Sequence, residues 1–292
     1  MIVVTLMWSI AGVVTRHLES ARSFEVTFWR SAFTVIALAL LLPALPAGGA
    51  RRTLRTRADW ANTIRAGSGT LAISSVCWCV MFTAFMVALT LTSVANVLIT
   101  MALAPLFTAL LARIALGHRL ATRTWAAIVV AGVGIGWMYA REVDGGDGRH
   151  LLGTLVALGV PIAAATNWTV IQHSRATRDV DLLPAVLFGA MLSALITLPL
   201  SWPFGASRHD LALLALLGVL QLAVPCLMSV AAARHLSAPE ASLLALLEVV
   251  FGVLWAWLGA DESPSRDVLV GGALVLGALA GNEALALRRT AR

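Results

Sequence analysis

Two charged residues lie inside long apolar stretches of this sequence, where an isolated charge is costly. Arg30 falls within the stretch 24–45, and Glu248 falls within the stretch 238–259. Arg30 could bind a substrate carboxylate, or it could form a structural ion pair or contact a lipid headgroup. Glu248 could bind a substrate ammonium or carry a coupling proton, and a protonated carboxyl bonded to a neighbouring helix is an equal alternative. Both residues are candidates for binding a polar solute.

Uncharged polar residues in apolar stretches form a second group of candidates. Asn167 and Gln221 lie near the middle of two such stretches, and each could bind a solute or form a hydrogen bond between helices. Asn96 and Glu240 lie near the starts of two others, where capping of a helix N-terminus is the simpler explanation and solute binding is the alternative.

Aromatic residues within the apolar stretches could form the walls of a solute cavity. They are Trp8, Trp78, Phe82 and Trp168. Such rings suit an amphipathic solute or an ammonium group, but plain packing is the favoured explanation for each ring taken singly.

Signatures of several enzyme classes are absent from the sequence. Its 21 basic residues are all arginine, which excludes a Walker A lysine and a lysine Schiff base. No H-E-x-x-H or G-x-S-x-G motif occurs, and we interpret the pair His209-Asp210 as solvated surface in a loop. Three cysteines lie in apolar stretches and are expected to pack there: Cys77, Cys79 and Cys226. We therefore expect no catalytic residues, no metal and no cofactor.

The elements that position these residues are expected to be membrane-spanning helices. Of the 292 residues, 59% are hydrophobic and only 12% are charged, whereas soluble domains carry about 25% charged residues. The apolar stretches lack the alternation of barrel strands, which predicts an all-α integral membrane fold. We predict ten transmembrane helices: 1–17, 24–45, 64–88, 91–113, 124–140, 151–172, 183–202, 211–233, 238–259 and 268–287.

The distribution of arginine predicts how these helices are oriented. With a cytoplasmic N-terminus and ten spans, 14 arginines fall on the cytoplasmic side, 6 on the opposite side, and Arg30 within a span. The positive-inside rule thus places both termini in the cytoplasm. The net charge of +6 is then a topology signal and predicts no nucleic-acid partner.

A weak internal repeat divides the chain into residues 1–145 and 146–292. A shift of 144 residues places Ser93 on Ser237 and Phe107 on Phe251. Five helices in each half require the second copy to be inserted upside down. Inverted repeats of this kind underlie alternating access in secondary transporters. Pro105, Pro161, Pro199 and Pro225 could act as hinges for this motion or as static kinks.

The sequence resembles the EamA-type members of the drug/metabolite transporter superfamily over essentially its whole length. The resemblance is carried by Met7-Trp8-Ser9, Trp29-Arg30-Ser31, Pro105-Leu106-Phe107, Leu247-Glu248-Val249 and the acidic turn Asp261-Glu262. Ala11 stands where the family commonly has asparagine, and Val249 stands where it has proline. The opening Met-Trp-Ser and the helix at 163–172 are most similar to YddG-type amino-acid exporters. The resemblance implies ten helices around a central cavity.

These observations predict a secondary transporter that exports a small polar metabolite, with amino acids as the favoured cargo on resemblance alone. The alternatives are a transporter of drugs, sugars or other metabolites and, less favoured, a membrane-embedded enzyme. The expected location is the bacterial inner membrane, with lipid and a small-molecule substrate as partners. The chain is expected as a monomer or, through Gly-x-x-x-Gly pairs, as a homodimer.

Overall fold

The computed structural model describes residues 1–45, 54, 56–116, 121–144, 148–177, 182–232 and 238–290. Within these ranges every regular element is a helix, which confirms the predicted all-α class. The helices are α1 (Ile2–Ser9), α2 (Ala11–Arg16), α3 (Ser23–Ala44), α4 (Arg57–Leu91), α5 (Val94–Met101), α6 (Ala104–Leu116), α7 (Thr122–Asp144), α8 (Gly148–Thr177), α9 (Leu183–Ser201), α10 (Arg208–Leu216), the π-helix η1 (Leu217–Ala223), α11 (Val224–Ala232), α12 (Ala238–Ala260) and α13 (Arg266–Thr290).

The helices have the length and apolar character of membrane spans. Among the described residues, seven segments are long and apolar enough to cross a membrane: Ser23–Ala44, Gly69–Leu91, Val94–Leu111, Gly148–Val170, Leu183–Ser201, Arg208–Ser229 and Arg266–Ala286. Two shorter apolar segments are Ile2–Arg16 and Leu244–Ala260. The chain is therefore a multi-pass membrane protein, and each range predicted as a span contains helix.

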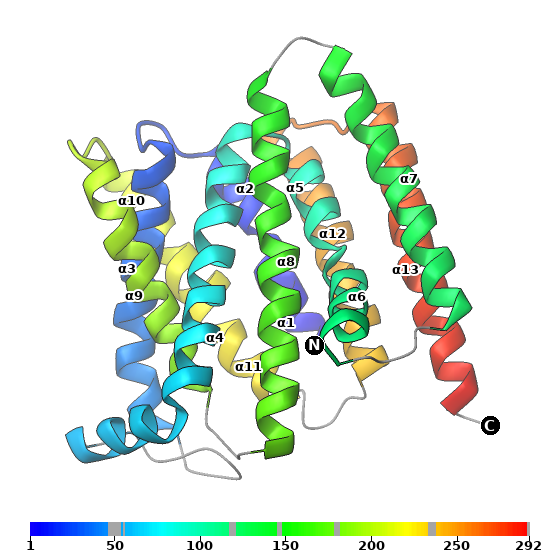
Figure 1. Ribbon diagram of the computed structural model, residues 1–292. Coiled ribbons are helices and arrows are strands. Elements are labelled where there is room, and N and C mark those ends of the chain that lie inside the picture. Colours follow the sequence, from blue (N-terminus) through cyan, green and yellow to red (C-terminus); the bar gives the residue numbers. More distant parts are fainter. Residues whose placement is uncertain are drawn as a thin grey trace.

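The long helices run side by side between two ends of the bundle (Figure 1). We call the end that carries the turns 17–22, 91–93, 202–207 and 261–265 the upper end, since it is uppermost in Figure 1. The lower end carries the first turn of α4 and the C-terminus.

Three of the predicted spans are interrupted. The first breaks at Ile10 between α1 and α2, and the fourth breaks at Ala102–Leu103 between α5 and α6. The eighth changes from α-helix to π-helix over Leu217–Ala223.

Two of the four prolines considered as hinges lie directly after an interruption. Pro105 is the second residue of α6 and Pro225 is the second residue of α11. Each lacks the N–H that would continue the preceding helical bonding, which explains why the regular helix does not run through these points. Pro161 and Pro199, by contrast, lie inside the uninterrupted helices α8 and α9.

The centre of the larger hydrophobic core is α5. All residues from Val94 to Thr100 are buried, and side chains from α2, α4, α8, α12 and α13 pack around them. Close approach depends on glycine here, because a Cβ on Gly252 of α12 would collide with the side chain of Leu98. Below the break, α6 is packed more loosely, since Leu106 is the buried exception among partly exposed residues 104–111.

Helices α7 and α13 pack against each other at the edge of the bundle (Figure 1). Gly134 of α7 lies so close to the backbone of α13 that a Cβ would stand 2.7 Å from the Gly271 carbonyl oxygen. The remaining helices therefore form the body in which the polar residues are buried.

Candidate functional site

Arg30 is buried in the middle of the bundle. It lies on α3 with 1% of its surface exposed. One terminal nitrogen donates to Gln221 Oε1 at 3.3 Å and the other donates to the Phe82 carbonyl at 3.1 Å. Its guanidinium carbon also lies 5.6 Å from the ring centre of Phe82 and 5.9 Å from that of Phe85. The cation is thus held by neutral groups on α4 and η1.

A buried guanidinium ordinarily needs an anion, because desolvation of an uncompensated charge is costly. Among the described residues, no carboxylate forms an ion pair with Arg30. Its Nε atom is buried and has no hydrogen-bond partner in this part of the chain. The positive charge and the Nε donor thus have no negatively charged partner among the described residues.

The π-helix η1 positions Gln221 beside Arg30. Gln221 Nε2 donates to the Trp8 carbonyl at 3.2 Å, so the same side chain bridges α3 and α1. Close contact with α3 requires glycine at position 218, since a Cβ there would lie 2.7 Å from the Arg30 carbonyl oxygen. Thr34 Oγ1 in turn donates to the Gly218 carbonyl at 3.0 Å. Short π segments are frequent at functional sites because they redirect a side chain in this way.

Two further buried residues lie nearby, Cys226 of α11 and Glu248 of α12. We call Arg30, Gln221, Phe82, Cys226 and Glu248 the Arg30 cluster. Glu248 is 9% exposed and Cys226 is 4% exposed. The Cys226 thiol lies close enough to both Arg30 and Glu248 to experience the charge of each. Both charged candidates from the sequence are therefore neighbours of Cys226, the thiol that the sequence indicated as packing.

Three of the four aromatic candidates lie in or against the second hydrophobic core cluster, which contains Phe82 beside Arg30. Phe82 belongs to the second hydrophobic core cluster, and Trp8 and Trp78 pack against that cluster from α1 and α4. The rings of Trp78 and Phe82 lie 5.3 Å apart. Trp168 differs, because it is 52% exposed and belongs to neither described core cluster. The structure does not place it with the other aromatic candidates.

The other two amide candidates lie away from Arg30. Asn167 of α8 is buried and accepts a hydrogen bond from Ser74 of α4 at 2.7 Å, which is the inter-helix role considered above. Asn96 is buried in the first turn of α5. Its backbone N–H is capped by Ser93, and its Nδ2 donates to Thr92 Oγ1 at 3.2 Å. Ser93, rather than Asn96, is thus the N-cap of α5, and the side chain of Glu240 lies outside the described part of the structure.

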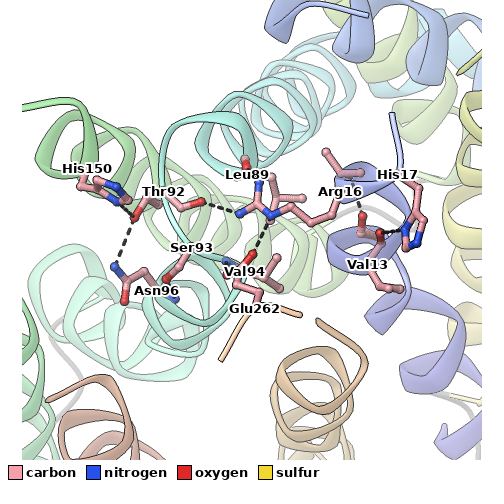
Figure 2. Close-up of polar contacts among 12 residues, drawn as sticks. Val13, Arg16, His17, Leu89, Thr92, Ser93, Val94, Asn96, His150 and Glu262 are labelled. Atoms are coloured by element: carbon pink, nitrogen blue, oxygen red, sulfur yellow. Dashed lines mark hydrogen bonds and ion pairs between the residues drawn. The ribbon is translucent and has the colours of Figure 1, made fainter. Parts of the chain in front are cut away.

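An ion pair that sequence reasoning missed lies at the upper end (Figure 2). Arg16, the last residue of α2, donates from Nε to Glu262 Oε2 at 2.6 Å. Its terminal nitrogens donate to the carbonyl oxygens of Leu89 at 2.6 Å and Thr92 at 2.9 Å. Glu262 also accepts the backbone N–H of Val94 at 2.6 Å. We call this Arg16–Glu262 pair, with its backbone contacts, the latch.

The turn after α12 places Glu262 in the latch. Asp261 adopts a left-handed conformation with φ of 52°, and the Glu262 N–H donates back to the Ala256 carbonyl at 3.2 Å. The Glu262 N–H thereby satisfies one of the carbonyl groups near the C-terminal end of α12. A cavity of about 380 Å³ adjoins the latch, and it is lined by Arg16, Thr90, Leu91, Thr92, Ser93, Arg149, His150 and Glu262.

Asp210 corrects one interpretation from the sequence. We expected His209-Asp210 as solvated surface, but Asp210 is 0% exposed. Its carboxylate accepts the backbone N–H groups of Glu19, Ser20 and Ala21 at 2.8 to 3.0 Å. It thereby joins the start of α10 to the turn between α2 and α3, and the pattern of a polar pair in a loop gave no sign of partners 190 residues away.

Comparisons with known proteins identify the family and support the fold. The sequence profile of the EamA-like transporter family matches residues 1–140 and 151–282. A crystal structure of a protein superimposes with a TM-score of 0.61, covering 99% of this chain and 96% of its own at 17% sequence identity, which supports the fold alone. No curated protein sequence matches. The two matched segments cover most of the chain, so the protein belongs to the EamA-like transporter family and is a membrane transporter of small molecules.

Proposed function

We propose that this protein is a secondary transporter that exports small zwitterionic metabolites, with amino acids as its cargo. It works by alternating access between two inverted five-helix repeats, residues 1–145 and 146–292. It resides in the bacterial inner membrane with ten spans and both termini in the cytoplasm.

Arg30 is the observation that carries the proposal. Its cation is buried against neutral partners, and no described carboxylate pairs with it. A substrate carboxylate would supply the missing negative charge, and a planar guanidinium binds such a group with good geometry. Glu248 is buried on α12 near Cys226, and in this proposal it would attract the substrate ammonium. A zwitterion would therefore satisfy both charges of the cluster.

The packing of the helices supports the inverted repeat. If the two halves of the chain are exchanged, the helix pair α1 and α12 corresponds to the pair α8 and α6. Both pairs are in contact. In the same way the pair α4 and α9 corresponds to the pair η1 and α3, and both pairs are in contact. The edge helices α7 and α13 are the last helices of the two halves, so this pair corresponds to itself when the halves are exchanged. The family profile also matches two segments that nearly coincide with the proposed halves.

A second cargo class follows from the aromatic side chains. Trp8, Trp78 and Phe82 lie next to the cluster, and such rings would suit an amphipathic drug as well as an amino acid. The charge requirement separates the two possibilities, because a neutral drug gains nothing from Arg30.

The test is transport of labelled amino acids by the purified protein in liposomes, with and without an imposed pH gradient. We compare the native chain with Arg30→Ala and Glu248→Gln. The matched control is Arg208→Ala, which removes an exposed arginine outside the cluster. Saturable transport that Arg30→Ala abolishes and Arg208→Ala preserves is the expected result. If folded native protein transports no amino acid, the cargo assignment is wrong. Transport that is unaffected by the gradient and by Glu248→Gln would exclude proton coupling through Glu248.

A further inference from the structure

We propose that Arg16 and Glu262 form the gate that closes the solute path at the upper end of the bundle. The inference rests on the alternating-access function proposed above. It assigns the opening step to two residues that lie outside the Arg30 cluster.

The latch joins four helix ends that come from three separate parts of the sequence. Arg16 ends α2, and its guanidinium holds the Leu89 and Thr92 carbonyls at the C-terminal end of α4. Glu262 follows α12 and holds the N–H of Val94, the first residue of α5. Figure 2 shows both side chains pointing toward the turn between α4 and α5. One ion pair thus keeps these four ends together.

Each charge of the latch lies at the helix end that favours it. A cation is stabilised near the carbonyls at a helix C-terminus, and an anion is stabilised near the N–H groups at a helix N-terminus. Arg16 lies at the C-terminal end of α4, and Glu262 lies at the N-terminal end of α5. Separation of the pair therefore weakens three attractions together, and this favours a closed and an open state over intermediate ones.

The latch lies at the tightly packed end of the path. Directly below it, Val94 to Thr100 of α5 are all buried, and a Cβ on Gly12 of α2 would collide with Val94. The lower half of the same span, α6, is partly exposed along residues 104–111 with the exception of Leu106. A carrier that releases solute at the upper end must therefore part the helices that the latch connects.

Parting the two charges is feasible because water is close. The side chains of Arg16 and Glu262 keep 27% and 21% of their surface exposed. The adjoining cavity of about 380 Å³ reaches the exposed residues Arg149 and His150 at the start of α8. Both charges can be hydrated when they separate, so the pair is strong enough to hold the closed state and weak enough to break.

The native thiol of Cys226 provides the test, since it lies buried beside Arg30. In a Cys77→Ser, Cys79→Ser background, a small membrane-impermeant methanethiosulfonate is applied to the upper face of the membrane, and the rate of Cys226 modification is measured. We expect Glu262→Gln to raise this rate about five- to tenfold, because loss of the pair shifts the population toward the open state. Gln retains an acceptor for the Val94 N–H, so the change is mainly one of charge.

The matched control is Asp261→Asn. It removes the same charge one residue away, Asn tolerates the left-handed φ of 52°, and Asp261 is exposed outside the latch. We expect its labelling rate to equal that of the background. Cys226→Ser should abolish the signal, and Arg16→Lys should give an intermediate rate because lysine cannot reach all three acceptors as a fork.

An unchanged Cys226 rate in folded Glu262→Gln and Arg16→Lys would overturn the gate. Labelling uses no solute, so the two proposals can fail separately. Faster labelling of Cys226 without any amino-acid transport would support the gate and reject amino acids as the cargo. Amino-acid transport with an unchanged labelling rate would support the proposed transport function and reject the gate.

Discussion

Replacing Arg30 with methionine removes the buried positive charge and keeps most of the side-chain volume. The hydrogen bonds of Arg30 to Gln221 and Phe82 measure 3.3 and 3.1 Å, which is longer than the 2.7–2.9 Å typical of strong charge-assisted bonds. Their loss should cost about 1 kcal/mol each, and relief of the buried charge offsets that cost. We expect the melting temperature of Arg30→Met in detergent to lie within a few degrees of the native value.

Solute binding should respond far more strongly than stability. A carboxylate paired with a buried guanidinium contributes about 2–5 kcal/mol when one partner is truncated, which corresponds to a loss of affinity of about 30- to 3000-fold. Equilibrium binding of a labelled amino acid to purified Arg30→Met, measured beside Arg208→Met, checks this figure. Arg30→Lys retains the charge and should recover part of the affinity. Native-like affinity in a folded Arg30→Met protein would refute the assignment of Arg30 as the carboxylate-binding residue.

Three further substitutions test other parts of the structure. Glu248→Gln should weaken binding of an amino acid more than binding of its deaminated carboxylate analogue, and equal effects on both ligands would remove the ammonium role. Asp210→Ala leaves the backbone N–H groups of Glu19, Ser20 and Ala21 without their shared acceptor. We therefore expect the free energy of unfolding to fall by about 3 kcal/mol. Denaturation in mixed micelles measures this loss, and an unchanged midpoint would contradict it. Gly218→Val should separate η1 from α3 and reduce both expression and binding, whereas native behaviour would show that this crossing is not tight.

The helices were predictable because each is encoded locally. An apolar stretch of about 20 residues specifies a membrane helix regardless of its neighbours. The helices overlap the predicted ranges, although α4 begins already at Arg57 and α8 extends to Thr177. The breaks at Ile10 and Ala102–Leu103 were not predicted. Pro105 marked the second break, but Pro161 and Pro199 gave the same signal in helices that continue. Proline alone does not distinguish an interruption from a tolerated kink.

The pairing of polar residues was not predictable, because it depends on which helices become neighbours. Arg30 and Glu248 were recognisable as candidates from their depth in apolar stretches. Only the folded structure shows that both lie near Cys226. Arg16 and Glu262 are separated by 246 positions, and each alone resembles an ordinary charge at a helix end. Trp168 had the same sequence signal as Trp78, and only the structure separates them.

The π-helix at Leu217–Ala223 has a consequence for how this chain can change in length. A π segment closes its hydrogen bonds over five residues instead of four, so it accommodates an additional residue within a helix. Deletion of one residue here would return the segment to an α-helix, and the faces that α10 and α11 present to their neighbours would be preserved. The same event elsewhere in the span would rotate everything beyond it by about 100°. Gln221 lies in this segment, so we expect one-residue length variation in this helix to alter the contacts of Arg30 while the surrounding bundle stays intact.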